Sequence, residues 1–105
     1  MIWIHCDTEQ LCLEIRGHAN LAPRGEDLVC CAVSTLTVTL AQNLKRLEQE
    51  GKGECRVRMI PGKAELVCKP KDRFRTEATL VYQTVSTGLQ WLSRAFPENV
   101  TVIFI

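Results

Sequence analysis

His18 and Cys30 are the two residues of this chain whose types and spacing are best suited to chemistry. They lie twelve positions apart in the stretch RGHANLAPRGEDLVCCAVS, which covers residues 16–34. A cysteine thiolate is a strong nucleophile, and a neighbouring imidazole can take up the thiol proton and later donate a proton to a leaving amine. The pair therefore points to cleavage of an acyl bond, although two such residues at this spacing are a weak signal on their own.

Cys30 is predicted to lie in the first turn of a helix that begins after Asp27. Backbone N–H groups of a first turn lack intrahelical partners, and the helix dipole favours negative charge there. Both effects favour thiolate over thiol, and the pKa of cysteines in such settings falls from about 8.5 to roughly 3.5–7.5. The same N–H groups are expected to be free to stabilise the oxyanion of a tetrahedral intermediate.

Two further residues near the pair are candidates for supporting roles. Asp27 could orient His18, but an aspartate just before a helix is more often its N-cap. Ser34 lies one helical turn after Cys30 on the same face. Its hydroxyl can bond either a group of the site or its own backbone, and the sequence does not separate these two roles.

Gly17 and Gly25 bracket the polar segment 19–26, which connects a predicted strand to the predicted helix. If the two glycines act as pivots, this segment could close over a bound peptide. A plain surface connection fits the same sequence, so both interpretations stay open.

Zinc binding is the first competing interpretation. Ligand-type side chains are present at His5, Cys6, Cys12, His18, Cys30 and Cys31. However, no C-x2-C or H-x3-H spacing occurs among them, and two adjacent cysteines chelate a metal poorly. We therefore expect no metal site and no other cofactor.

Nucleic-acid binding is the second competing interpretation, because a basic segment follows the fourth predicted strand. Its basic side chains are Lys69, Lys71, Arg73 and Arg75. Asp72 interrupts the segment, and Phe74 is its only aromatic residue. The whole chain has a formal net charge of only +1. We expect a solvated connection and no direct contact with nucleic acid.

The size and composition of the chain limit the classes of protein to which it can belong. Its 105 residues fit a single domain, residues 1–105. We expect no membrane span, because no uninterrupted apolar run of sufficient length occurs, and no signal peptide at MIWIHCDTEQ. These features predict a cytoplasmic protein with reduced thiols. Four cysteines inside apolar strand patterns are then expected to be core or strand-face residues: Cys6, Cys12, Cys55 and Cys68.

The elements that must position the His–Cys pair follow from hydrophobic periodicity. Alternating side chains predict five strands, at residues 1–6, 11–17, 54–60, 64–69 and 99–105. Spacings of three and four predict two helices, one from Asp27 to Gly51 and one over 76–96. The order ββαββαβ predicts an α+β fold, a two-layer sandwich of a mostly antiparallel five-stranded sheet with two helices.

The last predicted strand, NVTVIFI, is apolar on both faces. Such a strand is typical of a central position in a sheet or of an oligomer contact. Together with the long first helix it carries more apolar surface than a two-layer monomer easily buries, which favours a homodimer.

One set of residues around the pair resembles the motif of a known family. The matching positions are Gly17-His18-Ala19, Gly25, Asp27, Val29-Cys30 and Ala32-Val33-Ser34. They resemble the ribosomal-processing cysteine protease family, Prp. The motif covers about a fifth of the chain, and the length and order of the predicted elements are compatible with that family.

The resemblance implies a small homodimeric cysteine endopeptidase. Such an enzyme removes the N-terminal extension from the precursor of ribosomal large-subunit protein twenty-seven. By the same resemblance Cys30 is the nucleophile and His18 its partner, and an apolar groove near Cys30 receives bulky apolar residues of the precursor peptide. Cys31 stands where a small apolar residue is expected, but it points about 100° away from Cys30 around a helix and should not replace it. The alternative hypothesis is a non-catalytic, ribosome-associated peptide-binding module that uses the same groove.

Overall fold

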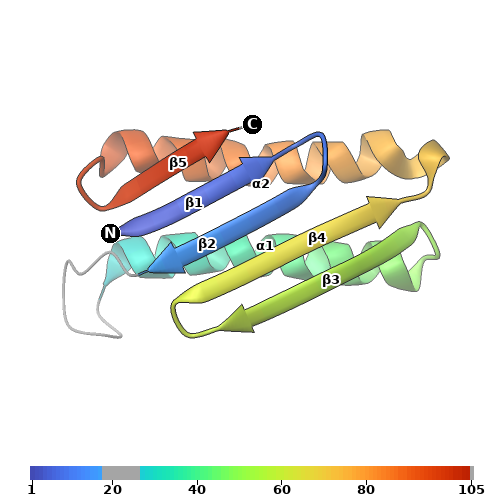
Figure 1. Cartoon of the computed structure of the whole chain (residues 1–105), viewed down its shortest axis with the longest axis horizontal. Helices are drawn as coiled ribbons and strands as arrows, with labels where there is room; N and C mark the ends of the chain where they lie inside the picture. Colours follow the sequence, from blue (N-terminus) through green and yellow to red (C-terminus); the bar gives the residue numbers. More distant parts are fainter. Residues whose placement is uncertain (18–26, 105) are drawn as a thin grey trace.

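The computed structural model describes residues 1–17 and 27–104, which form one sheet with two long helices packed on one face (Figure 1). The elements in chain order are β1 (Ile2–Asp7), β2 (Cys12–Gly17), α1 (Leu28–Gln49), β3 (Gly53–Ile60), β4 (Lys63–Pro70), α2 (Arg75–Ala95) and β5 (Val100–Phe104). A short 3-10 turn, Asp72–Phe74, precedes α2 inside the segment that was predicted as a charged connection. The predicted order ββαββαβ and the two-layer α+β sandwich are confirmed.

The sheet has the strand order β3-β4-β2-β1-β5. Three neighbouring pairs are antiparallel, β1 with β2, β2 with β4 and β3 with β4, while β5 runs parallel to β1. The sheet is therefore mostly antiparallel, as predicted. Figure 1 shows β5 over α2 at one edge and β3 over α1 at the other.

The strand β5 lies at an edge of the sheet, so of the two interpretations of its sequence the central position is wrong, and the oligomer contact stays a prediction. The chain returns from α2 to pair with β1, and no described strand lies on the outer side of β5. Val100 is buried under α2, but Ile103 and Phe104 remain exposed. The apolar character of this strand therefore does not come from burial on both faces.

Each helix covers the sheet with one apolar stripe. The buried residues of α1 are Val29, Val33, Thr37, Leu40, Leu44 and Leu47. Those of α2 are Ala78, Tyr82, Val85, Ser86, Leu89 and Leu92. Two apolar residues near these stripes, Leu36 and Phe96, are not among the buried residues. Leu36 faces α2, where it lies against Gly88, and Phe96 is partly exposed just after α2 ends.

The helix α1 is long and apolar enough to cross a membrane by length and composition alone, with a mean hydropathy of 1.3. The core helix of a folded domain passes the same test, and the buried stripe of α1 belongs to the hydrophobic core that it shares with the sheet. Thr37 is polar, but its hydroxyl donates a hydrogen bond of 2.7 Å to the Val33 carbonyl, so it can be buried in this stripe. We therefore interpret α1 as the main core helix.

The stability of the fold should fall at alkaline pH because several buried groups hold their protons. Burial raises the pKa of the Cys6 thiol to about 11 and that of Cys55 to about 12, and it also raises the pKa of Tyr82. In the unfolded chain these groups ionise near their ordinary values, about 8.5 for cysteine and about 10 for tyrosine. The unfolded state then binds fewer protons than the folded state, and unfolding becomes more favourable as pH rises.

We therefore expect the free energy of unfolding to be level up to about pH 8 and to decline between about pH 9 and 11. Urea titrations followed by circular dichroism at a series of pH values would measure it. The variant Cys6→Ala should show a shallower decline than the parent chain. A free energy of unfolding that stays constant to pH 11 would contradict this prediction.

Candidate active site

Three parts of the chain meet at one end of the molecule: the end of β2, the start of α1 and the turn between β3 and β4 (Figure 1). A pocket of about 120 Å³ lies between them. Its lining is mostly apolar and comes from both layers, the sheet and α1. We refer to it as the Cys30 pocket, and its lining includes Ile2, Ile15, Cys30, Val33, Met59 and Ile60. An apolar depression next to Cys30 is thus present, as the resemblance implied.

Cys30 lies in the first turn of α1, as predicted. Its side chain is half-buried and packs against the edge of the hydrophobic core while it still lines the pocket. The thiol therefore stands on the wall of a depression that leads to solvent, not in the interior. This placement allows a peptide carbonyl to reach it.

Asp27 is the N-cap of α1, which confirms the capping interpretation. The side chain is buried, and its Oδ1 accepts hydrogen bonds from the backbone N–H groups of Val29 and Cys30, each at 3.0 Å. The prediction that the N–H groups of this turn are free was wrong for these two residues. The physical reason is that a buried carboxylate satisfies the same donors that an oxyanion would need. While the cap is in place, an oxyanion at Cys30 needs other donors.

His18 and Gly25 lie outside the described residues, together with the rest of 18–26, so the reach of His18 to Cys30 stays a prediction. The two residues that flank this segment are described. Gly17 lines the Cys30 pocket, and its N–H donates to the Gly62 carbonyl at 2.9 Å. Asp27, at the other end, binds the N–H of Cys30. Of the two flanking residues, Gly17 therefore borders the pocket and Asp27 contacts Cys30, which borders it as well.

Ser34 lines the same pocket as Cys30, so the two residues share a face of α1 as predicted. Its side chain is exposed. Cys31 is also exposed, but it lines a different depression on the outer surface of α1, together with Val38. The two adjacent thiols therefore face different surroundings, and only Cys30 borders the apolar pocket.

The other four cysteines are part of the sheet, as expected. Cys6 and Cys68 are buried, and Cys12 and Cys55 are partly buried. The sulfur atoms of Cys55 and Cys68 lie 3.1 Å apart on neighbouring strands as free thiols. Burial raises the pKa of all four thiols. Such thiols react slowly, because the thiolate is the reactive form.

We expect iodoacetamide at about pH 7.5 to modify Cys30 and Cys31 well before the four sheet cysteines, because thiolate content and exposure control the rate. Peptide mapping by mass spectrometry over time would locate the adducts. All six cysteines should react at similar rates once the chain is unfolded in urea. Early modification of Cys6 or Cys68 in the folded protein would show that the assigned burial is wrong.

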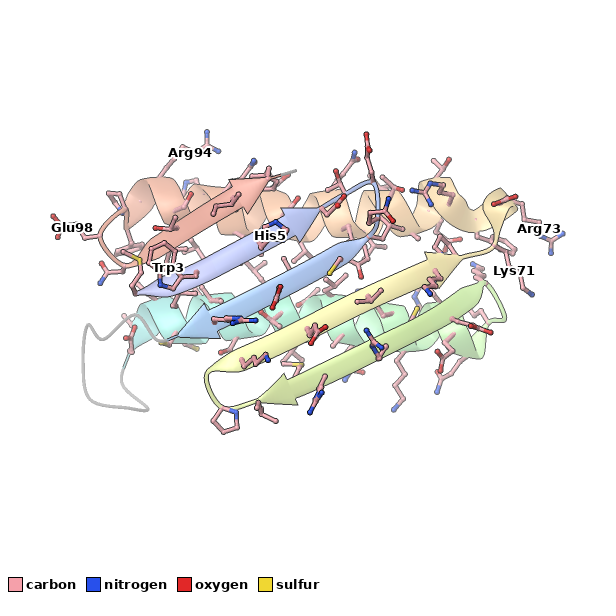
Figure 2. The ribbon with its side chains drawn as sticks, viewed as in Figure 1. Trp3, His5, Lys71, Arg73, Arg94 and Glu98 are labelled. Atoms are coloured by element: carbon pink, nitrogen blue, oxygen red, sulfur yellow. The ribbon has the colours of Figure 1, made fainter. Side chains whose placement is uncertain are left out.

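The other two interpretations of the sequence concern a metal ion and nucleic acid. No group of three or more His, Cys, Asp or Glu side chains within residues 1–17 and 27–104 is arranged to hold a metal ion. Figure 2 shows Lys71 and Arg73 at the end of the molecule opposite to the β3–β4 turn. The Arg73 guanidinium lies 4.7 Å from the centre of the Phe74 ring, so part of this basic segment has a packing role.

Comparisons with known proteins agree with the fold and identify a matching family. The model of a family described as cysteine protease Prp matches residues 1–101. The fold is similar to that of a ribosomal processing protease Prp from S. aureus in complex with a covalently linked product peptide, with a TM-score of 0.79, 20% identity and full coverage of both chains. A complex described as the same protease with a substrate peptide gives a TM-score of 0.73 at 19% identity over the full length of both chains.

The fold is also similar to that of SMU.848 from Streptococcus mutans, with a TM-score of 0.68 and 23% identity. That match covers 99% of this chain and 91% of the other. No curated protein sequence matches the chain closely enough to count as a relative.

Proposed function

Because the chain belongs to the cysteine protease Prp family, we propose that it removes the N-terminal extension from the precursor of ribosomal large-subunit protein twenty-seven and so supports ribosome maturation. The observation that carries this proposal is the position of Cys30, whose thiol stands on the wall of an apolar pocket at the first turn of α1. In the sequence, His18 directly follows Gly17, which lines the same pocket. The S. aureus protease holds a covalently linked product peptide, which supports a peptide as the substrate.

In this proposal Cys30 is the nucleophile and His18 its acid–base partner. The Sγ atom attacks the carbonyl carbon of the scissile peptide bond and forms a tetrahedral intermediate. The C–N bond then breaks, and the His18 imidazolium donates a proton to the leaving amine. Water, deprotonated by the same imidazole, hydrolyses the thioester and releases the thiol.

Asp27 and Ser34 support this reaction from α1. Asp27 fixes the first turn and so holds the backbone of Cys30 in place, and it is a candidate to orient His18. Ser34 offers a hydroxyl on the wall of the Cys30 pocket, where it can donate to a peptide carbonyl. Gly17 and Gly25 bracket the segment that would close over the bound peptide.

The apolar lining of the Cys30 pocket supports a preference for bulky apolar residues before the cleaved bond. Side chains from both layers, Ile2 and Val33 among them, can surround such a residue and remove its surface from water. A protease that relies on this burial should cleave a peptide with small polar residues at the same positions much more slowly.

We also place the reaction in the cytoplasm and propose that the chain acts as a homodimer. Exposed apolar side chains support the homodimer: Leu28 and Val38 on the outer surface of α1, and Ile103 and Phe104 on β5. No charged residue occurs in α1 before Lys45. Sedimentation at micromolar concentrations would test the homodimer, and a strictly monomeric species would rule it out.

The direct test is incubation of the protein with the precursor from the same organism, followed by mass measurement. We expect two products whose masses sum to the precursor plus one water. A matched precursor in which serine replaces the apolar residues before the cut should be cleaved much more slowly. Binding of the precursor without cleavage would instead favour the peptide-binding module.

A further inference from the structure

Two cysteines that the proposed function does not use lie directly opposite each other on neighbouring strands. Cys55 of β3 is the register partner of Cys68 of β4, and their free thiols are within 3.1 Å of each other, sulfur to sulfur. Cys68 belongs to the hydrophobic core, and Cys55 packs against it. The other two sheet cysteines, Cys6 and Cys12, have no cysteine as a register partner.

The backbone hydrogen bonds define the type of position that this pair occupies in the ladder. The N–H of Cys55 donates to the Glu48 carboxylate of α1 at 2.8 Å, and the N–H of Cys68 donates to the Leu11 carbonyl at 3.0 Å. Neither N–H is therefore directed at the opposite cysteine. Opposite residues of an antiparallel pair that do not exchange N–H···O bonds have Cα atoms only about 4.5 Å apart, and their side chains are close.

This geometry fits the requirements of a disulfide bond. Disulfides join residues whose Cα atoms lie about 4.4–6.8 Å apart, and a non-hydrogen-bonded antiparallel pair falls at the near end of that range. The sulfur atoms have to approach by only about 1 Å to reach the bonded distance of about 2.05 Å. The two strands are already paired over their whole length, so the backbone does not have to rearrange for the bond to form.

We propose that Cys55 and Cys68 are an oxidation site, at which a peroxide converts the two thiols into a reversible disulfide that staples the edge strand β3 to β4. This inference concerns a place other than Cys30 and does not depend on the proposed function. In the described part of the chain, β3 pairs only with β4, so the bond would secure a strand that has one neighbour. Disulfides that form in reducing compartments are usually transient and responsive to oxidants.

The reaction takes place in two steps. The Cys55 sulfur, the less buried of the two, attacks one oxygen of hydrogen peroxide; the O–O bond breaks, and the leaving hydroxide takes the thiol proton and departs as water. Cys55 is then a sulfenic acid. The Cys68 sulfur attacks the Cys55 sulfur, the S–O bond breaks, and the hydroxyl group leaves with the Cys68 proton as a second water. Two thiols lose two electrons in total, and one peroxide gains them.

Burial makes this site slow to react near neutral pH. It raises the pKa of both thiols, that of Cys55 to about 12, and the nearby Glu48 carboxylate adds to the effect. The thiolate is the attacking form, so little of it is present at any moment. We therefore expect the disulfide to form on sustained exposure to peroxide, after Cys30 and Cys31 have been oxidised.

The test is peptide mapping of the folded parent chain during treatment with hydrogen peroxide at about pH 8, where the fold is expected to be fully stable. Free thiols are blocked with iodoacetamide in urea before digestion. We expect a linked peptide that contains Cys55 and Cys68, lighter by two hydrogen atoms than the two separate peptides and released by dithiothreitol. Three results would overturn the inference: separate sulfinic acids at the two positions, links to other cysteines, or free Cys55 and Cys68 after Cys30 is fully oxidised.

Thermal unfolding provides a second measurement, on the variant with Cys30→Ala and Cys31→Ala so that the outer thiols do not interfere. A bond between residues thirteen positions apart restricts the unfolded chain. We expect peroxide to raise the unfolding midpoint by about 5–10 °C and dithiothreitol to reverse the rise.

The matched control adds Cys55→Ala to this variant, which keeps Cys68 but removes its partner. Its midpoint should not rise with peroxide, and circular dichroism would confirm that it is folded; if it is not, Cys68→Ala takes its place. An equal rise in the control would assign the effect to another oxidation. An unchanged midpoint in a chain that mapping shows to be linked would contradict the staple.

Discussion

Replacement of Cys30 with alanine should abolish cleavage of the precursor, with a fall in kcat/KM of at least about a thousandfold. The variant loses the only thiol that borders the apolar pocket within the described residues. Its fold should be retained, because the side chain is half-buried at the edge of the core and alanine favours helix. We expect a change in the free energy of unfolding below about 1 kcal/mol.

The matched control is Cys31→Ala, which removes the adjacent thiol from the outer surface of α1. It should keep the activity of the parent chain within about twofold, since surface substitutions have small effects. His18→Ala should behave like Cys30→Ala if the two residues act as a unit. Cleavage that persists in Cys30→Ala but is lost in Cys31→Ala would move the nucleophile to the other cysteine and overturn the assignment.

Local patterns predicted the elements of the fold well. The apolar residues from Val29 to Leu47 recur at the helical period. This local pattern predicts which face of α1 is buried under the sheet. Asp27 was predicted as the N-cap because its carboxylate precedes the first apolar turn, and the structure confirms it. The position of Ser34 beside Cys30 followed from the same helical geometry.

Long-range contacts could not be predicted in this way. The edge position of β5 depends on its parallel pairing with β1, which no local period encodes. The contribution of Met59 to the Cys30 pocket depends on how the β3–β4 turn meets the start of α1. The loss of free N–H groups at the start of α1 was in principle foreseeable, because an N-cap carboxylate and an oxyanion compete for the same donors.

The substitution Gly17→Ala is expected to destabilise the fold strongly. Gly17 ends β2 with a φ of 97°, and a Cβ atom at this position would lie 2.2 Å from the carbonyl oxygen of Met1. That oxygen is backbone, so the start of β1 would have to move away. The left-handed backbone alone costs about 1–3 kcal/mol for an alanine, and the clash adds to it. We expect a loss of more than about 2 kcal/mol in the free energy of unfolding, measured by urea titration.

Gly51→Ala is the matched control for this prediction. Gly51 also has a left-handed backbone, with a φ of 72°, but beyond its chain neighbours no described heavy atom lies within 4 Å of the position of its Cβ. Substitution of Gly51 by alanine should therefore lower the free energy of unfolding by about 1 kcal/mol, through the left-handed backbone alone. Gly17→Ala should in addition reduce cleavage, because β1 supplies Ile2 to the Cys30 pocket and Gly17 precedes His18. Equal losses of stability in the two variants would show that the start of β1 does not hold the end of β2 as closely as the structure describes.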